Sequence, residues 1–290
     1  HVIEFIEEMI DSEKSSTLRE MYYISEGWGL GKFENQNGSN NLAEDLEIVT
    51  KCMREDFKLR PEEDGARMIG NVTIEERNRR GEWMTINCRD DVGDSGYGLP
   101  YNVEPEKIRL IDEDVDYIMA IETGGMFDRL VENGFDEDSR CALIHLKGQP
   151  ARSTRRMIKR MSEAWNKPVM VFADCDPWSF RIFASIAYGA IKTAHISEYL
   201  ATTGAEYLGI TADDIEAYDL PSDKLTPKDI EALKAELSDP RFSTGAWQDQ
   251  INMMLENGKK AEQQSLAKYG LDYVTDEYLP QKLAEFGLGG

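Results

Sequence analysis

The chain has 290 residues, 41% of them apolar, which suffices for one large or two ordinary domains with a substantial core. Its net charge of −22 at pH 7 opposes nucleic-acid binding over the whole surface, so any such binding must use a confined basic region. Four scattered cysteines without a C-x-x-C pair and only three histidines argue against a zinc site, a disulfide framework and His-based catalysis. We therefore expect a cytoplasmic protein. No apolar run approaches the ~20 residues of a membrane span, and no secretory signal opens the sequence.

The first part of the chain predicts three helices. Apolar residues between Val2 and Ile10 fall on one face of an amphipathic helix. Thr17 and Glu20 form a capping box, which predicts a second helix from Leu18 to about Ile24. A third helix is expected at 42–57.

Two β-like segments follow, Arg67–Ile74 and Glu82–Cys88, and a basic turn that contains Arg77, Arg79 and Arg80 joins them. Three helices followed by a hairpin with a basic tip are typical of a winged helix. In that arrangement one helix enters the major groove of DNA and the wing contacts phosphates. A small α+β module without a DNA role remains the alternative.

From Ile108 onward the pattern changes to alternating strands and helices. The expected strands are 115–121, 141–146 and 169–173. One helix is expected to end at Glu132, and two more are expected at 154–165 and 178–191. This alternation predicts a parallel, Rossmann-like sheet. The expected α/β multidomain organisation is a winged-helix domain at 1–90, a linker at 91–106, and a sheet domain with helical additions at 107–290.

Carboxylates follow two of the predicted strands. Glu122 ends one strand, and Asp174 and Asp176 follow another. Because open parallel sheets place their chemistry at the carboxyl ends of strands, these side chains could meet there and share a hard cation such as Mg²⁺. The alternative is that Glu122 and the aspartates only cap the helices that follow.

The basic residues are concentrated between Lys147 and Arg160, a stretch without any acid. Lys147 stands at a strand end, and Arg152 and Arg155 stand near a helix start, so these three are candidate phosphate contacts. A solvated helix face is the alternative, and it applies most to Lys159 and Arg160.

Four motifs in order along the chain resemble those of the A subunits of archaeal DNA topoisomerase VI and, more distantly, the meiotic protein that makes double-strand breaks. The motifs are Thr17–Ser25, Ile121–Phe127, His145–Pro150 and Asp174–Ser179. The resemblance covers almost the whole chain. It implies that the sheet domain is a Toprim domain, in which Glu122, Asp174 and Asp176 bind Mg²⁺.

The resemblance also implies that Tyr23 attacks DNA and that Arg19 assists it. A phenol with a pKa of ~10 is a weak nucleophile at neutral pH, so it needs a base or a nearby cation. Arg19 lies four residues before Tyr23, on the same helical face. Two departures are visible: Cys175 stands where the family pattern has glycine, and the chain begins closer to the tyrosine motif than expected, which suggests a missing N-terminal segment.

The family implies a homodimer that makes paired breaks in double-stranded DNA through 5′-phosphotyrosyl links. Nucleophile and metal lie on different domains, so a second protomer could complete each site. No G-x-x-x-x-G-K-[ST] loop occurs, so ATP is expected on a separate B subunit in an A2B2 assembly. The rivals are a meiotic-type break-making protein, a Toprim nuclease that uses water, and a winged-helix regulator.

Overall fold

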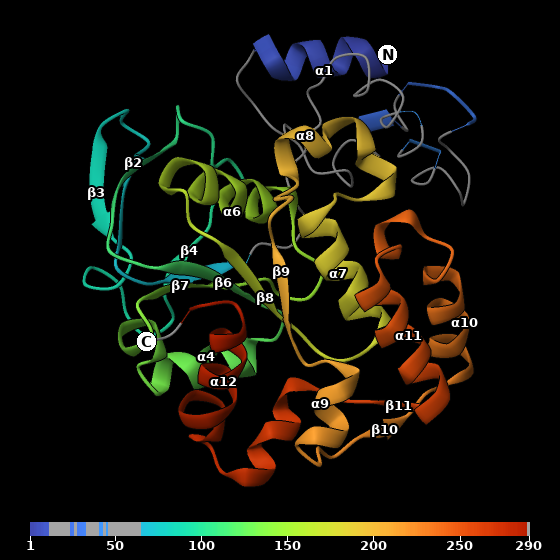
Figure 1. Ribbon diagram of the computed structural model, residues 1–290. Coiled ribbons are helices and arrows are strands. Elements are labelled where there is room, and N and C mark those ends of the chain that lie inside the picture. The colour runs from blue at the N-terminus through green and yellow to red at the C-terminus, as the bar shows by residue number, and fades with distance from the viewer. Residues whose placement is uncertain (12–23, 26–27, 33–40, 43–44, 46–64, 289–290) are drawn as a thin grey trace.

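The computed structural model describes residues 1–11, 24–25, 28–32, 41–42, 45 and 65–288 (Figure 1). The predicted N-terminal helix is confirmed as α1, Val2–Asp11. The predicted helices at 18–24 and 42–57 lie almost wholly outside the described residues, and so do Arg19 and Tyr23.

A six-stranded sheet forms the centre of the molecule, in the order β4-β1-β7-β6-β8-β9. Its strands are β1 (Arg67–Ile69), β4 (Tyr97–Gly98), β6 (Tyr117–Ile121), β7 (Cys141–His145), β8 (Val169–Phe172) and β9 (Glu206–Gly209). The last four run parallel, which confirms the predicted Rossmann-like core. At one edge β1 runs antiparallel to both β7 and β4. Strands β6, β7 and β8 are buried at every position, so both faces of the sheet must be covered.

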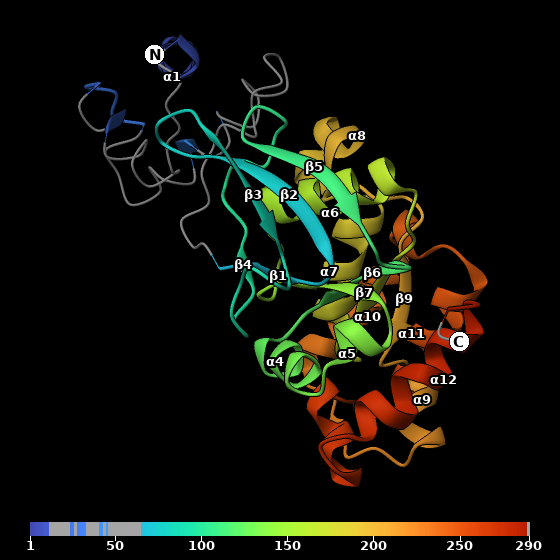
Figure 2. The same cartoon turned by 90° about the vertical axis from the view of Figure 1, so that its left-hand side faces the viewer.

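Helices cover both faces of this sheet. Figure 1 shows α6 and α7 above it and α4 and α12 below it, and Figure 2 agrees. The helices between the parallel strands are α4 (Gly124–Glu132), α5 (Phe135–Asp138), α6 (Arg152–Trp165), α7 (Pro177–Ala187) and α8 (Ser197–Leu200). The end of α4 and the whole of α6 are close to the predicted positions, because their apolar residues recur at helical spacing. Helix α7 is shorter than expected, and a 3₁₀ turn at Ile191–Ile196 precedes α8.

The chain after β9 is mainly helical. It contains α9 (Ala212–Ala217), α10 (Pro227–Glu236), α11 (Gly245–Asn257) and α12 (Leu279–Glu285), with β10 (Asp223–Lys224) paired to β11 (Lys259–Lys260). Shorter turns occupy Pro240–Phe242, Gln263–Tyr269 and Val274–Tyr278. Thr226 caps α10 in a reciprocal pair with Asp229, as expected for a helix that begins at Thr226-Pro227. No described helix is long and apolar enough to cross a membrane.

A buried ion pair fixes the C-terminal helix α12 to α9. Lys282 Nζ lies 3.1 Å from Asp214 Oδ1, and both side chains are less than a tenth exposed. Tyr278 donates a hydrogen bond of 2.7 Å to Asp214 Oδ2, which also accepts one from the backbone N–H of Thr211. The carboxylate is thus compensated at both oxygens, as a buried charge requires.

A separate three-stranded antiparallel sheet, β3-β2-β5, contains the predicted hairpin. Its strands are β2 (Val72–Arg77), β3 (Trp83–Asn87) and β5 (Ile108–Glu113). The prediction of one strand over 67–74 is wrong. The chain bends at Gly70, which has φ +150° and would place a Cβ 2.8 Å from the Ala142 Cα, so β1 enters the main sheet while β2 leaves it.

Short connections join this small sheet to the main one at two places. Two residues separate β1 from β2, and three separate β5 from β6. The backbone N–H of Asp114 donates to Asn71 O at 2.9 Å, which ties the two connections together. The basic turn after β2 is therefore attached to the main sheet by two adjacent strands (Figure 2).

Candidate functional site

Glu122 and Asp174 lie side by side at the carboxyl ends of two neighbouring strands. Strands β6 and β8 are paired in parallel, with Ile121 opposite Phe172. The backbone N–H of Asp174 donates to Glu122 Oε2 at 3.1 Å, and that of Glu122 donates to Phe172 O at 3.1 Å. The sheet topology thus brings together two carboxylates that are 52 residues apart in the sequence.

Asp176 begins α7 as its N-cap residue. Its Oδ1 accepts a hydrogen bond of 2.7 Å from the backbone N–H of Ser179, and Pro177 occupies the first helical turn. The capping alternative considered from the sequence therefore holds for this aspartate. A cap uses one carboxylate oxygen, so it does not exclude a role in metal binding.

The site disfavours negative charge in the absence of a cation. Burial raises the pKa of Asp174 to about 7, and the neighbouring Glu122 carboxylate adds to this effect. Burial also raises the pKa of Glu122, with a smaller contribution from Asp176, while the Ser179 side chain and the Asp174 N–H oppose the rise. Partly buried carboxylates that repel one another are stabilised by a bound cation.

The donor set suits Mg²⁺ in its chemistry, because hard cations of this kind prefer carboxylate oxygens. The conformation described does not itself form a complete set of ligands. Among the described residues no three His, Cys, Asp or Glu side chains converge on a point that could hold a metal ion. Each of the three carboxylates has one oxygen that accepts a hydrogen bond from a backbone N–H, so its second oxygen is the one that could coordinate a metal ion.

Gln263 connects the two halves of the site, and sequence analysis missed it. Its side chain is fully buried, and its backbone N–H donates to Asp174 Oδ1 at 2.8 Å. Its side-chain carbonyl accepts from Thr123 Oγ1 at 3.1 Å, next to Glu122. The exposed Gln264 donates to the same hydroxyl at 3.2 Å. Gln263 therefore holds the Glu122 loop against Asp174.

Two further contacts fix the loop that carries the aspartates. The Tyr207 hydroxyl donates to Asp174 O at 2.6 Å. Cys175, which stands where the family pattern has glycine, is fully buried and forms an antiparallel bridge with Ala261, with N–O distances of 2.8 and 3.2 Å. The thiol is thus accommodated as a core side chain pointing away from solvent.

The basic residues near the sheet edge occupy different environments. Lys147 is exposed directly after β7, in a turn where the Gly148 N–H donates to Glu122 O at 3.1 Å. Arg152 begins α6 and is half-buried. Arg155 is only 5% exposed and donates to Ser185 O at 3.4 Å, so it holds α6 against α7.

The expectation that Lys159 and Arg160 form a solvated helix face is wrong. Lys159 donates to Ala201 O at 2.9 Å, and Arg160 donates to Ile108 O at 3.0 Å. Both cations satisfy backbone carbonyls of neighbouring segments, which their place in a basic stretch of sequence does not reveal.

The turn between β2 and β3 exposes three arginines, Arg77, Arg79 and Arg80. Asn78 shapes this turn, because its side-chain oxygen accepts from the N–H groups of Arg80 and Glu82 at 2.9 and 3.0 Å. Arg77 Nε donates to Gly81 O at 3.3 Å. The cations are therefore presented at the tip of an ordered hairpin.

Three family profiles match consecutive parts of the chain. The profile for the Toprim domain of Spo11 and of topoisomerase 6 A subunits matches residues 117–283, which is more than half of the sequence. The chain belongs to the family of topoisomerase VI A subunits. A profile for the all-beta domain in the DNA topoisomerase VI alpha subunit matches residues 62–114, and one for type IIB DNA topoisomerase matches residues 1–59.

Individual members of this family are similar over nearly the whole chain. The A subunit of the Type 2 DNA topoisomerase 6 of Archaeoglobus fulgidus is 59% identical over 288 residues, which cover 99% of this chain and 79% of the relative. Those of Natronomonas pharaonis and Methanosarcina mazei are 54% and 56% identical, over 99% and 98% of this chain and 78% and 76% of their own lengths. Membership confirms the resemblance and gives the chain the role of the DNA-cleaving and rejoining subunit of a type IIB topoisomerase.

Proposed function

We propose that this topoisomerase subunit cleaves DNA with Tyr23 as the nucleophile, in a Mg²⁺-dependent reaction that relaxes or decatenates DNA. Tyr23 and Arg19 lie outside the described residues, so their assignment rests on the sequence motif. The observation that carries the proposal is the pair of strand ends that place Glu122 against Asp174, with Asp176 at the adjoining helix start. A site with this much negative charge has an evident use for a cation.

In this proposal Glu122, Asp174 and Asp176 hold the Mg²⁺ ion. When bound, the ion neutralises negative charge on the phosphate that is attacked and on the departing oxygen. Arg19 is proposed to stabilise the Tyr23 phenolate or the charge on that phosphate, because a spacing of four residues would place both side chains on one face of the helix that the sequence predicts. Gln263 keeps the carboxylates in register through its contacts with Asp174 and Thr123.

DNA phosphates are proposed to contact Lys147, Arg152, Arg77 and Arg79. Lys147 adjoins the carboxylate edge, and the two arginines of the hairpin turn are exposed at its tip. The proposal does not depend on Arg155, because its burial leaves little guanidinium surface for a phosphate. These confined cations would offset the strong overall negative charge where DNA approaches.

For the assembly we propose a homodimer in which each protomer cuts one strand, joined to an ATP-binding B subunit in an A2B2 complex. The 290-residue sequence contains no phosphate-binding loop of the G-x-x-x-x-G-K-[ST] type, which supports the proposal that a separate subunit binds ATP. Cys88, Cys141 and Cys175 are buried free thiols, which supports a reducing compartment such as the cytoplasm. The division into residues 1–90, a linker at 91–106 and residues 107–290 stays a proposal, although β1 and β4 pair within the main sheet.

The decisive experiment compares Tyr23→Phe with Tyr22→Phe. Tyr23→Phe should abolish the denaturant-resistant protein–DNA adduct that forms with Mg²⁺ and DNA, because the phenol oxygen is the attacking atom. DNA affinity should change less than about twofold, and Tyr22→Phe should retain adduct formation. Adducts in the Tyr23 variant would refute the nucleophile assignment.

The same assay separates the remaining rivals. A Toprim nuclease that uses water would cleave without an adduct, and a winged-helix regulator would not cleave at all. A meiotic-type protein would form adducts without rejoining the ends. Reversal of the adduct when Mg²⁺ is removed before denaturation supports the topoisomerase.

A further inference from the structure

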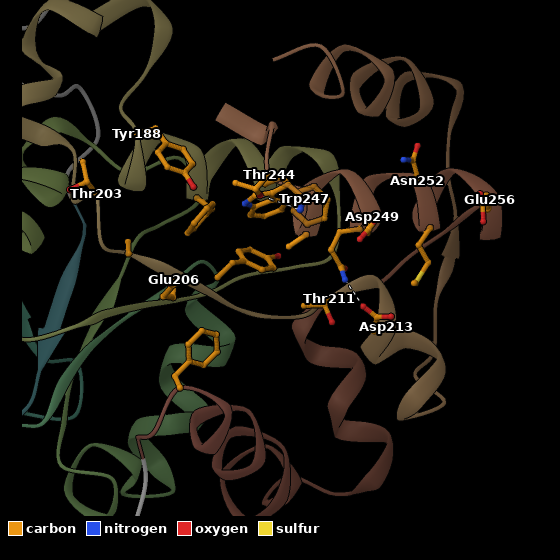
Figure 3. Close-up of a pocket in the computed structure, with 18 residues that line it drawn as sticks. Tyr188, Thr203, Glu206, Thr211, Asp213, Thr244, Trp247, Asp249, Asn252 and Glu256 are labelled. Carbon is orange, nitrogen blue, oxygen red and sulfur yellow. Dashed lines mark hydrogen bonds between the residues drawn. The ribbon is translucent and has the colours of Figure 1, made fainter. Parts of the chain in front are cut away.

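A cavity of about 1000 Å³ opens beside the edge strand β9, between α7, α9 and α11 (Figure 3). None of the candidate metal ligands or DNA contacts lines it. Its size is at the upper end of the range typical of small-molecule sites. The proposed cleavage reaction makes no use of this cavity.

The floor of the cavity is aromatic. Trp247 of α11 packs against Phe180, Phe183 and Tyr207, with ring centroids 5.0, 5.2 and 5.3 Å apart. The hydroxyl of Tyr207 is fixed by its hydrogen bond to Asp174 O. The floor is therefore a pre-organised apolar surface, in which Trp247 is 9% exposed and Phe180 and Phe183 are 0% and 2% exposed.

The rim of the cavity is acidic. Glu206, Asp213, Asp249 and Glu256 are exposed around the opening, and no Lys, Arg or His is among the lining residues (Figure 3). Asp213 accepts a hydrogen bond from Gln250, which also lines the cavity. Within the described chain no ion pair involves Glu206, Asp249 or Glu256, so their charges are not neutralised there by a protein cation.

Two of these carboxylates are spaced along one wall. Asp249 and Glu256 are seven residues apart on α11, which places them on the same helical face and about 10 Å apart along the axis. The exposed carboxylates attract cations by direct charge interaction, and the apolar floor suits hydrocarbon segments. A chain of methylenes with an ammonium group near each end satisfies both features, whereas phosphates and other anions are repelled.

We propose that this cavity binds a linear polyamine. Its hydrocarbon segments lie over the aromatic floor, and its ammonium groups pair with Asp249 and Glu256 on α11 and with Asp213 or Glu206 on the opposite side. The same chemistry could come from a run of lysine side chains in a polypeptide. The separation of about 10 Å between Asp249 and Glu256 along α11 suits the terminal ammonium groups of a free polyamine.

Calorimetric titration of spermidine into the protein, without DNA or Mg²⁺, tests the proposal independently of cleavage. We expect saturable binding with one site per chain. The double variant Asp249→Asn/Glu256→Gln should weaken it at least about tenfold, because two carboxylate partners are lost. Both residues are exposed, and far-ultraviolet circular dichroism should verify that the variant is folded.

The matched control is Glu137→Gln/Glu231→Gln, which removes the same charge at exposed positions outside the cavity and should leave the affinity unchanged. Equal weakening by both double variants would mean diffuse attraction to an acidic protein, and the proposal would fail. It would also fail if hexaamminecobalt(III), which has charge without methylenes, bound the cavity as well as spermidine did. If a capped trilysine peptide bound and spermidine did not, the cavity would be assigned to a polypeptide, and the proposal of a polyamine ligand would be refuted.

Discussion

Gln263→Ala is expected to weaken metal binding, although Gln263 is not itself a proposed ligand. The change removes the carbonyl that accepts from Thr123 Oγ1 at 3.1 Å and leaves the backbone N–H that donates to Asp174. Loss of an orienting partner behind metal ligands typically lowers affinity about 10- to 100-fold, or roughly 1.4–2.7 kcal/mol. Folding stability should fall by about 2–4 kcal/mol, from one hydrogen bond and a cavity at a fully buried position.

Calorimetric titration of Mg²⁺ or Mn²⁺ into the DNA-free protein measures the affinity, and urea unfolding measures the stability. Gln264→Ala is the control, since its exposed side chain donates to the same Thr123 hydroxyl at 3.2 Å. Its metal affinity should change less than about twofold, because solvent can replace an exposed donor.

Metal affinity and folding stability together distinguish a role of Gln263 in positioning the carboxylates from a role in core packing alone. If Gln263→Ala lost stability but bound the metal with the parent's affinity, its contacts would only support the core. The proposed link between Thr123 and Asp174 would then have no part in shaping the metal site.

Three further predictions concern DNA, pH and the core. Arg79→Ala/Arg152→Ala should flatten the log–log dependence of DNA affinity on salt by about two units, at about 0.9 per phosphate contact, when affinity is measured across salt concentrations. Glu236→Gln should flatten the pH dependence of unfolding, because burial raises the pKa of the Glu236 carboxyl from 4.5 to about 7. In the parent, the protonated Glu236 carboxyl contributes to the free energy of unfolding, and this contribution is complete below pH 4.5. It is lost as the pH rises through 7, which lowers the free energy of unfolding by about 3 kcal/mol. The variant has no carboxyl at this position and should not show this loss. Lys282→Met should cost about 3–5 kcal/mol in urea unfolding, because it leaves the Asp214 carboxylate buried without its cation.

Variants at exposed positions serve as controls for the DNA and core predictions. Lys228→Ala, at an exposed position on α10, should leave the salt dependence unchanged; an equal change there would mean that only net charge matters. Equal pH dependence in the parent and Glu236→Gln would show that Glu236 is ionised throughout. Lys268→Met breaks an exposed pair with Asp219 and should cost less than about 1 kcal/mol, so a similar loss in both lysine variants would contradict the role of burial.

The sequence predicted well those parts of the fold that depend on local periodicity. The apolar run at 141–146 became β7, and the amphipathic stretch at 154–165 became α6. The expected strand at 67–74 failed because its bend at Gly70 depends on the close approach of Ala142, a contact between residues distant in sequence. Strand β5 was missed for a related reason, since its pairing with β2 is decided by tertiary contacts.

The candidate site divides in the same way. The proximity of Glu122 and Asp174 followed from the rule that parallel strands end at one edge of a sheet. Gln263 could not be found in this way, because it reaches Asp174 with a backbone N–H from 89 residues further along the chain. Arg155 is the opposite case. Its charge suggested a contact with phosphate at the surface, but it lies on the face of α6 that packs into the core.

The attachment of the small sheet has a mechanical consequence. Strands β2 and β5 run into β1 and β6 through connections of two and three residues, and the contact between Asp114 and Asn71 braces them at the root. A small sheet attached through two adjacent strands resists bending far better than a loop attached through a single flexible segment. If DNA contacts the tip near Arg79, as proposed, a force applied there would be transmitted through β2 and β5 to β1 and to β6, the strand that ends at Glu122. On that proposal, deformation of the bound duplex and the alignment of the carboxylates would be mechanically coupled through these two connections.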